Sequence, residues 1–403
     1  MPTKGIVFQV KERMPDQLYW LMKEFRLMVN KTIRVGLDSK VTSRYKLCGL
    51  VYQTYRREHS VYSQYVPSVV EVACLILKNR RKAIRKGADA KIPYARRLSL
   101  KLENQGYKLN RQTGELDVPI RAHEHLKLQL VLSDYHRGFL LDESYSLGSL
   151  TICPERVIIA FRKEAPKPYV PKSVISLDTN ERSLDGVMLT KKSFVPVKAE
   201  YSEVAVIQEH HQERRRKLQK KKAHDRRTSK KLTSEEGRRE HNRVEYRLHQ
   251  VANVVIEFAK DNKSMIVLED LTGIKSKWKS KKLNRRISNW PRRELHRLIE
   301  YKAEWNGVPI EWRNPVNSSR RCPRCGKINK SRLGNRDRYF CKECGWSINR
   351  HINAGLNLLQ PVLVEHPELR GLRFDLDVLQ HDAMKTLYSD DRTRSESNGV
   401  SKS

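Results

Sequence analysis

Four cysteines near the end of the chain form two short pairs. Cys322 and Cys325 enclose two residues, and Cys341 and Cys344 enclose two more after fifteen intervening residues. Two C-x-x-C turns at this separation supply four thiolates to one tetrahedral zinc ion. The sequence therefore predicts a zinc ribbon, directly followed by an Asn-rich segment, 349–357, that is expected to begin a helix.

Two acids stand at the ends of apolar runs that are typical of buried strands. Asp178 follows Ser-Val-Ile-Ser-Leu, and Glu269 follows Ser-Met-Ile-Val-Leu, 91 residues further on. Carboxylates at the tips of buried strands can hold divalent cations near a phosphodiester. Each acid could instead simply end its strand, and Asp185 and Asp270 are less favoured carboxylates nearby.

The balance of charge restricts the class of partner. The chain has 403 residues, of which 81 are Lys or Arg and 46 are Asp or Glu, and its formal net charge is +35. A surplus this large indicates a polyanionic partner, namely nucleic acid. A generic cationic protein, such as a ribosomal component, is the alternative, but those are poor in long apolar cores whereas 38% of this chain is hydrophobic.

A long basic helix is expected from about 203 to 260. Its first half has no apolar stripe, whereas its second half has one, from Val244 to Phe258. We expect the first half to contact phosphates, with solvated surface as the alternative, and the second half to pack on a sheet. The basic residues are Arg214, Arg215, Arg216, Lys217, Lys220, Lys221, Lys222, Arg226, Arg227, Lys230 and Lys231.

The first 172 residues combine strands with helices. Residues 4–10 alternate as a strand, and apolar residues recur at helical spacing from Leu18 to Ile33 and again over about 61–85. Short β-like runs follow from about 94 to 172. We expect a small barrel or sandwich that includes the N-terminal strand, with the helices as an insertion, and a proline-punctuated linker after it.

The next part opens with the strand that ends at Asp178. Further strands are expected at 187–189, 194–197 and 308–312, and a helix from Trp290 to Trp305, while the tail 389–403 is expected to be disordered. The remaining cysteines are expected to be buried free thiols. With no signal peptide, no long apolar stretch and a zinc-type cysteine pattern, a soluble, cytoplasmic protein in a reducing compartment is expected.

Five blocks resemble the TnpB (OrfB) proteins encoded by insertion sequences, which are compact relatives of type V CRISPR effectors. The blocks lie in the family's order between residues 173 and 360. They are Ile175–Asn180, Val267–Leu271, Leu298–Glu304, Asn317–Ser319 leading into the four cysteines, and Asn353–Asn357.

The resemblance implies a multidomain α/β and α+β protein. It implies a wedge-like β-barrel (1–14 and 94–172) with a helical recognition insertion (15–93). An RNase H-like RuvC nuclease domain (173–317 and 346–388), interrupted by the zinc ribbon (318–345), would follow.

The resemblance also implies an RNA-guided DNA endonuclease. A guide RNA from the transposon end would pair with one strand of a double-stranded DNA target beside a short adjacent motif, and cleavage would need magnesium. The implied catalytic residues are Asp178 and Glu269, which would bind magnesium, together with the residue at 351. The family carries Asp there, whereas this chain has His351 behind Asn349. Imidazole can bind a divalent metal, and it suits manganese better than magnesium.

Two functions of different class therefore remain open. The first is the RNA-guided endonuclease, which the presence of both Asp178 and Glu269 favours. The second is an RNA-guided DNA-binding protein that has lost or weakened its cutting and acts like a repressor. A zinc-ribbon nucleic-acid binder and a strand-transferring transposase are less favoured alternatives.

Overall fold

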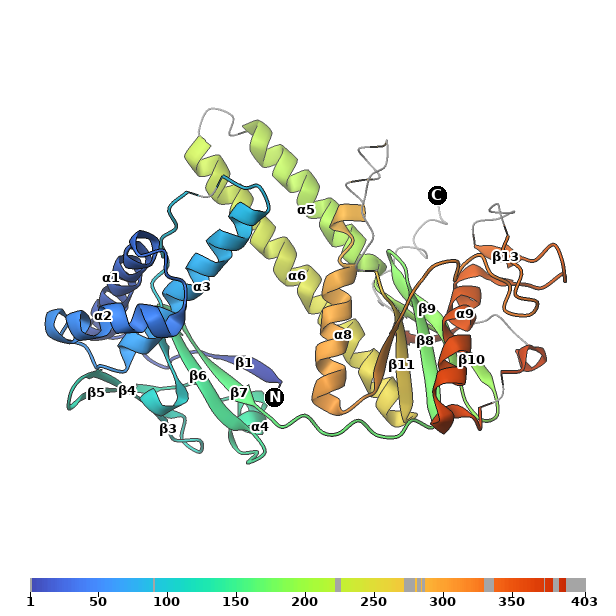
Figure 1. Cartoon of the computed structure of the whole chain (residues 1–403), viewed down its shortest axis with the longest axis horizontal. Coiled ribbons are helices and arrows are strands. Elements are labelled where there is room, and N and C mark those ends of the chain that lie inside the picture. The colour runs from blue at the N-terminus through green and yellow to red at the C-terminus, as the bar shows by residue number, and fades with distance from the viewer. Residues whose placement is uncertain are drawn as a thin grey trace, which may run out of the picture. The chain divides into compact units, whose positions relative to one another are not determined.

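The computed structural model describes residues 2–89, 91–221, 226–271, 280, 284, 287–329, 337–372, 374–379 and 384–388, with the backbone alone at 221, 226, 228, 229 and 378. The predicted disordered tail, 389–403, lies outside these residues. The chain divides into two compact units, Met1–Glu164 and Ala165–Ser403 (Figure 1). Within the described part, no helix combines the length and the apolar character needed to cross a membrane.

The strands of the first unit form two antiparallel sheets, with the orders β1-β7-β6-β2 and β3-β4-β5. β1 pairs with β7 from Thr3 opposite Arg162 to Phe8 opposite Val157. The prediction that the N-terminal strand joins the later strands is therefore confirmed. The strands are β1 (Thr3–Phe8), β2 (Leu100–Leu102), β3 (Lys108–Leu109), β4 (Glu115–Arg121), β5 (Glu124–Gln129), β6 (Ser146–Cys153) and β7 (Arg156–Arg162).

Three of the helices of this unit precede most of its strands. The apolar face predicted for α1 is buried, with Leu18, Met22 and Met28 fully inaccessible, and α3 packs against α1 as expected. α2 was not predicted, because only Leu47, Val51 and Tyr55 are buried along its fifteen residues. The helices are α1 (Asp16–Asp38), α2 (Arg44–Glu58), α3 (Tyr65–Arg85) and α4 (Asp134–Leu140), with a 3-10 turn at Asn104–Gly106.

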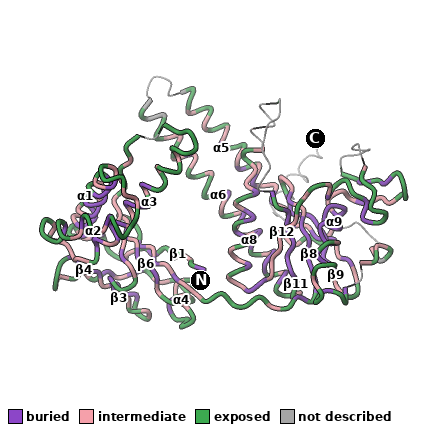
Figure 2. Tube along the Cα trace, in the orientation of Figure 1, coloured by how far each residue is buried: buried purple, intermediate pink, exposed green. Residues whose placement is uncertain are grey.

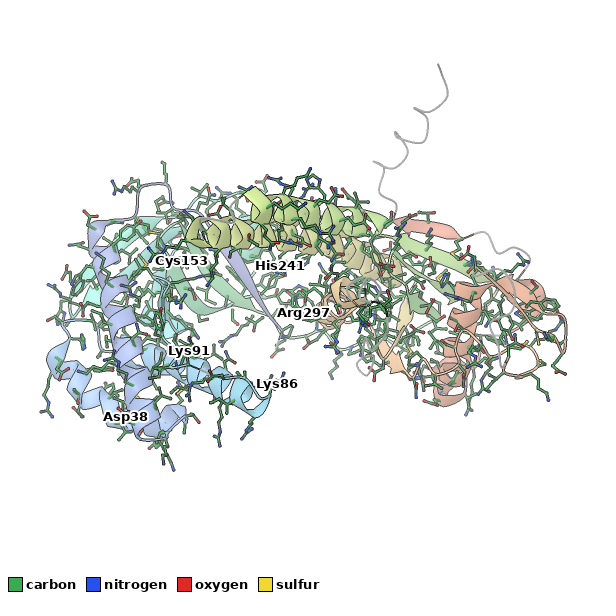
Figure 3. All side chains as sticks on the ribbon, turned by 90° about the horizontal axis from the view of Figure 1, so that it is seen from above. Asp38, Lys86, Lys91, Cys153, His241 and Arg297 are labelled. Carbon is green, nitrogen blue, oxygen red and sulfur yellow. The ribbon has the colours of Figure 1, made fainter. Side chains whose placement is uncertain are left out.

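The basic run at 78–86 lies at the end of α3. Its cationic side chains are exposed at five positions, and Figure 3 labels Lys86, the residue that follows the helix. An exposed cationic helix end is compatible with phosphate contact and with plain solvation alike. The exposed cations are Lys78, Arg81, Lys82, Arg85 and Lys86.

A mixed six-stranded sheet organises the second unit, in the order β12-β11-β8-β9-β10-β15. β8, β9 and β10 form an antiparallel meander that includes the strands predicted at 187–189 and 194–197, and β11 pairs in parallel with β8 and with β12. β15 was not predicted, because only Leu387 and Tyr388 of this edge strand are partly buried. The strands are β8 (Ser173–Thr179), β9 (Ser183–Leu189), β10 (Phe194–Glu200), β11 (Ser264–Glu269), β12 (Ile310–Arg313) and β15 (Lys385–Tyr388).

The two faces of this sheet are covered by different helices. Alternate side chains of a strand point to opposite faces. Ile175 and Leu177 of β8 pack with α6 and α8, whereas Val174 packs with α9. Figure 2 shows β8, β9 and β11 buried between these layers. The bounds are α8 (Arg292–Asn306) and α9 (Arg350–Glu365), with 3-10 turns at Pro367–Leu369 and Leu376–Val378.

The prediction of a single long helix over 203–260 is wrong. The structure has two helices, α5 (Ser202–Lys221) and α6 (Arg226–Asp261), that pack against each other (Figure 1). A buried pair joins them, His211 Nδ1 lying 2.7 Å from Glu236 Oε1. Because the charged stretch has no apolar stripe, its pattern could not indicate that the chain reverses direction. The apolar stripe predicted for the second half is confirmed, since Leu248 is fully buried in the sheet-facing core.

The helix α9 approaches β8 and β9 closely at Gly355. A Cβ atom on Gly355 would lie 3.2 Å from Gly186 Cα and 3.2 Å from Ser176 Oγ. Ser176 Oγ donates a hydrogen bond of 2.7 Å to the carbonyl of Gly355. Gly186 is equally restricted, because a Cβ atom there would lie 1.9 Å from the carbonyl oxygen of Ser176. Small residues on both elements therefore set the distance between helix and sheet.

We predict that Gly355→Ala lowers the free energy of unfolding by about 1–2 kcal/mol, because overpacking outweighs the gain in helix propensity. Urea unfolding measures the change. The matched control is Gly237→Ala in α6, where no atom lies within 4 Å of the added Cβ. That variant should gain roughly 0.5–1 kcal/mol, and equal stability of the two variants would contradict the prediction.

Candidate active site

The register of three neighbouring strands brings three carboxylates level with one another. Asp178 on β8 is paired with Asp185 on β9. Leu268 on β11 is paired with Leu177 on β8, so Glu269 is level with Asp178 one residue further along. We call Asp185, Asp178 and Glu269 the acid row.

The acid row lies on the sheet face that α9 covers. Side chains on one strand share a face when they are an even number of residues apart. Each acid stands in that relation to a buried valine that packs in the same cluster as the apolar residues of α9. These valines are Val174 for Asp178, Val187 for Asp185 and Val267 for Glu269.

The first turn of α9 carries His351 to the acid row. The side chain of Asn349 caps this helix and accepts a hydrogen bond of 2.8 Å from the amide of His351. His351 lies one turn before Gly355 and therefore shares its face of the helix. Its Nδ1 atom lies 2.8 Å from Asp178 Oδ2. The structure thus brings His351 into contact with Asp178, at the strand ends where Glu269 also lies.

The contact with Asp178 determines which nitrogen of His351 is available. When Nδ1–H donates to the carboxylate, the neutral ring keeps its lone pair on Nε2. A histidine held by a carboxylate in this way is a common metal ligand and can also exchange a proton. Nε2 of His351 is therefore the atom suited to chemistry.

Glu269 is almost fully buried, with 4% of its surface exposed. Burial raises the pKa of Glu269 to about 9, and the nearby Asp178 adds to the rise, against opposing hydrogen bonds from Ser318 and from the backbone of Thr179. The Ser318 hydroxyl donates to Oε1 at 3.3 Å. In the absence of a cation, Glu269 therefore holds a proton at neutral pH, which a bound divalent ion would release.

Two asparagines of α9 hold Ser318 in place. Asn353 Nδ2 donates to the carbonyls of Ser318 and Arg321, and Asn357 Nδ2 donates to the same two carbonyls at 2.8 Å each. This contact fixes the segment that enters the cysteine region while the Ser318 hydroxyl faces Glu269. The sequence did not predict that Asn353 and Asn357 hold Ser318. Their spacing of one helical turn was the pattern that could have indicated a shared contact.

The four predicted zinc ligands lie together. Their sulfurs all lie within 4.8 Å of one another, with Cys322 3.5 Å from Cys344 and Cys325 3.6 Å from Cys341. Sulfurs around a tetrahedral zinc ion with bonds of about 2.3 Å are separated by similar distances. The chemistry of four thiols at this spacing fits a structural zinc ion.

Each cysteine pair closes in a turn that ends with glycine. The amides of Gly326 and Gly345 donate to the carbonyls of Cys322 and Cys341, at 2.9 and 3.1 Å. Both glycines have positive φ angles, of 75° and 72°, which L residues rarely adopt. The strands β13 (Arg338–Phe340) and β14 (Ser347–Asn349) pair on either side of the second turn, so the ribbon leads straight into α9.

The possible ligand atoms of the acid row and His351 are farther apart than those of the four cysteines. Among the described residues, the cysteines are the group of three or more possible metal ligands whose atoms all lie within 4.8 Å. The acid row and His351 nevertheless offer the oxygen and nitrogen donors that Mg²⁺ and Mn²⁺ accept. Asp178 and Glu269 are adjacent, and the pKa of Glu269 is strongly raised. A divalent cation between them would stabilise the charged form of both carboxylates.

Some of the predicted phosphate-binding cations have partners inside the protein. Arg214 Nε lies 3.1 Å from Glu236, and Arg215 pairs with Glu240 across the α5–α6 hairpin. Lys222 lies outside the described residues, and the side chains of Lys221 and Arg226 are not described. The remaining cations are exposed, namely Arg216, Lys217, Lys220, Arg227, Lys230 and Lys231.

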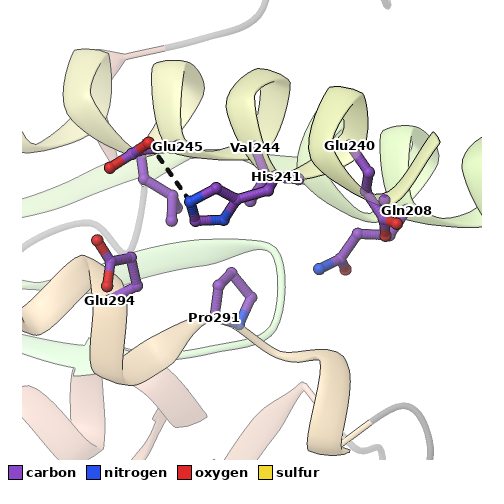
Figure 4. Close-up of a pocket in the computed structure, with 9 residues that line it drawn as sticks. Gln208, Glu240, His241, Val244, Glu245, Pro291 and Glu294 are labelled. Atoms are coloured by element: carbon purple, nitrogen blue, oxygen red, sulfur yellow. Dashed lines mark ion pairs between the residues drawn. The ribbon is translucent and has the colours of Figure 1, made fainter. Parts of the chain in front are cut away.

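A separate pocket lies between the α5–α6 hairpin and the start of α8 (Figure 4). Its carboxylates already have basic partners. Glu245 pairs with His241 at 3.6 Å, Glu294 with Arg297 at 2.5 Å, and Glu240 with Arg215. None of the acid row lines this pocket, so it is distinct from the candidate active site.

Comparison with known proteins first defines the class of fold. A solved Cas12f1–sgRNA–target DNA complex contains a chain that matches with a TM-score of 0.64 at 13% identity, covering 92% of this chain and 99% of that chain. A family model described as "Cas12f1-like, TNB domain" matches residues 293–358, and one for the uncharacterized protein MJ0013 family matches residues 21–116. The chain has a Cas12f-like α/β fold with a mixed sheet and a four-cysteine cluster.

Sequence relatives then identify the family. The TnpB-like protein MJ0751 of Methanocaldococcus jannaschii is 30% identical over 246 residues, which are 58% of this chain and 86% of that protein. The CRISPR-associated endodeoxyribonuclease Cas12f1 of Sulfoacidibacillus thermotolerans is 30% identical over 114 residues, 28% of this chain and 26% of that protein. The chain belongs to the TnpB-like family, as its motifs predicted.

We predict that the purified protein contains one zinc ion per chain, bound by the four cysteines. Replacing a single ligand, as in Cys322→Ser, should remove most of the zinc, because a four-coordinate site rarely survives the loss of a thiolate. Elemental analysis by mass spectrometry measures the content. Cys153→Ser, outside the cluster, should keep its zinc, and full zinc occupancy in Cys322→Ser would refute this assignment.

We predict that Glu269→Gln is more stable than the wild type at pH 8 in magnesium-free buffer. The folded carboxyl keeps its proton up to about pH 9, whereas the unfolded one ionises near pH 4.3. The wild type therefore loses stability as pH rises between these values, and the glutamine variant does not.

The difference should be at least about 1 kcal/mol at pH 8, or roughly 2–4 °C in melting temperature, and should vanish near pH 4. Thermal unfolding followed by circular dichroism measures it. Asp270→Asn, which changes the exposed neighbouring acid, is the control. Parallel pH profiles for Glu269→Gln and the wild type would refute the prediction.

Proposed function

We propose that the protein is an RNA-guided DNA endonuclease that cleaves target DNA beside a short adjacent motif. The observation that carries this proposal is the contact between His351 and Asp178 at the strand ends where Glu269 is buried. Such a group of carboxylates and an imidazole is suited to metal-dependent phosphodiester cleavage.

The relatives support the same conclusion. One is named a CRISPR-associated endodeoxyribonuclease, and the solved complex with the similar fold contains a guide RNA and target DNA. The net charge of +35 suits a chain that holds both nucleic acids. On this proposal the guide RNA comes from the transposon end, and base pairing reads the sequence of the target.

The catalytic residues in this proposal are Asp178, Glu269 and His351. Asp178 and Glu269 would hold Mg²⁺ or Mn²⁺, with His351 beside Asp178 as the third residue of the site. When bound, such an ion stabilises the attacking and leaving oxygens of the phosphodiester. Asp178 orients the imidazole, and the buried Val174 and Val267 lie on the same sheet face as the acids.

The two units suggest how nucleic acid is held. We propose that the strands of 1–14 and 94–172 form the wedge, that 15–93 form the recognition insertion, and that the RuvC domain (173–317 and 346–388) contains the ribbon (318–345).

The exposed cations of the α5–α6 hairpin would contact phosphates. Charge reversal at Lys217, Lys220 and Lys231 should then make the salt dependence of RNA binding shallower, by about 0.7–0.9 in log–log slope for each phosphate that the variant no longer neutralises.

A second function is favoured by one observation. The side chain that α9 brings to the acid row is an imidazole already paired with Asp178, and it adds no negative charge. A site that binds its cation too weakly would leave an RNA-guided DNA-binding protein that blocks transcription without cutting.

Cleavage of a plasmid library tests the proposal. The target would stand beside a randomised motif, and the protein would be co-expressed with RNA from its native flanking locus and assayed in Mg²⁺ and in Mn²⁺. We expect double-strand cuts beside a defined motif, more efficient in Mn²⁺ because a nitrogen ligand favours it. Glu269→Ala should reduce cutting to background, while Asp270→Asn should retain it. Target binding without cutting in either metal would establish the second function instead.

A further inference from the structure

Asp185 is a buried carboxylate that the catalytic residues named above leave out. It lies on β9 opposite Asp178, on the face that α9 covers, and only 3% of its surface is exposed. Carboxylates are almost never buried this deeply without a compensating partner. We therefore expect a hydrogen-bond donor or a positive charge next to the carboxylate of Asp185.

The hydrogen bonds of Asp185 satisfy only one of its oxygens. Oδ2 accepts from Ser183 Oγ at 2.6 Å and from Asn180 Nδ2 at 2.9 Å. Oδ1 is buried and has no donor among the described residues. The two donors on one oxygen hold the carboxylate in a single orientation, while the other oxygen has no hydrogen-bond donor.

The charges around Asp185 do not supply that partner. Lys198 is level with it on β10, but its ammonium group pairs with Glu200 at 3.3 Å and is partly exposed. His351 is bound to Asp178 through Nδ1. Burial raises the pKa of Asp185 and the nearby Asp178 adds to the rise, in spite of Ser183, His351 and Lys198. A cation at the strand ends would stabilise the charged carboxylate of Asp185.

We propose that Asp185 is a direct ligand of the divalent cation, through Oδ1, and supplies the third carboxylate of the site. The inference rests on the proposed metal-dependent function and deepens it. In this arrangement β9 contributes a charged oxygen and α9 contributes the neutral nitrogen of His351. The hydrogen bonds from Ser183 and Asn180 orient the ligand.

The competing explanation is that Asp185 only anchors the turn at residues 180–183. Asp185→Asn separates the two roles, because its amide oxygen can still accept from Ser183 and Asn180 while the negative charge is lost. Ser183→Ala is the complementary variant, which weakens the anchor and keeps the carboxylate.

Binding of Mn²⁺ to the full-length, zinc-loaded protein tests the proposal without any need for cleavage. Electron paramagnetic resonance measures free Mn²⁺ during a titration. We expect Asp185→Asn to weaken Mn²⁺ binding by at least about 100-fold, because loss of an outer-shell partner alone typically costs about 10–100-fold. Ser183→Ala should weaken it less, because Asn180 still donates to Oδ2, and Asp270→Asn should leave it unchanged.

Thermal unfolding checks that the variants are folded. Without Mn²⁺, Asp185→Asn should melt no lower than the wild type, since it removes a buried charge, and Mn²⁺ should raise its melting temperature less than that of the wild type. Wild-type affinity in Asp185→Asn, or an equal loss in Ser183→Ala, overturns the inference.

The outcomes also distinguish this inference from the function on which it rests. If Glu269→Gln loses Mn²⁺ binding but Asp185→Asn does not, Asp185 is not a ligand and the proposed nuclease site stands. If the wild type binds no Mn²⁺ at this site, both proposals fail together.

Discussion

The burial of three carboxyl groups side by side at the ends of β9, β8 and β11 is the constraint on which the candidate site of the second unit depends. The acids cannot separate, because strand register places Asp178 opposite Asp185 and level with Glu269. They cannot turn to the other face of the sheet, because side-chain alternation directs them to the face that α9 covers. The apolar residues on both faces of the sheet stabilise the fold, and the buried acids cost part of that stability. A bound cation would offset this cost, so the proposed metal site and the fold share one set of contacts.

The zinc ribbon is joined to this site by hydrogen bonds as well as by the chain. Asn353 and Asn357 bind the carbonyls of Ser318 and Arg321 just before Cys322, and the Ser318 hydroxyl reaches Glu269. At its other end the ribbon leads through β14 into α9 and His351. A zinc ion that orders the ribbon would therefore also order a donor to Glu269 and the helix start that carries His351. The four-cysteine cluster and the proposed catalytic residues are parts of one network.

Sequence reasoning predicted the parts of this site that depend on local pattern. Apolar runs ending in an acid identified β8 and β11, and paired cysteines identified the ribbon. The α5–α6 hairpin was missed because charged residues without an apolar stripe give no sign of a reversal. The roles of Ser318 and Asp185 depend on register and on contacts between segments far apart in the chain, which no local pattern carries. In the sequence, Asp185 could be recognised only as a less favoured carboxylate near Asp178. The pairing of β9 with β8 places it directly opposite Asp178.

The position of His351 illustrates why a site should be judged from its strands as well as from its motifs. Read from the motif alone, His351 leaves the site one carboxylate short. The sheet presents three carboxylates nevertheless, since Asp185 stands beside Asp178 with one oxygen held by two donors and the other bare. Adjacent strands are only about 4.8 Å apart. A carboxylate on β9 can therefore lie as near to Asp178 as a carboxylate on α9 would. A carboxylate on β9 then restores the three carboxylates of a site with an acid on the helix, and the imidazole on α9 adds a softer nitrogen donor. This difference in donor type, rather than a missing ligand, is what would favour Mn²⁺ over Mg²⁺.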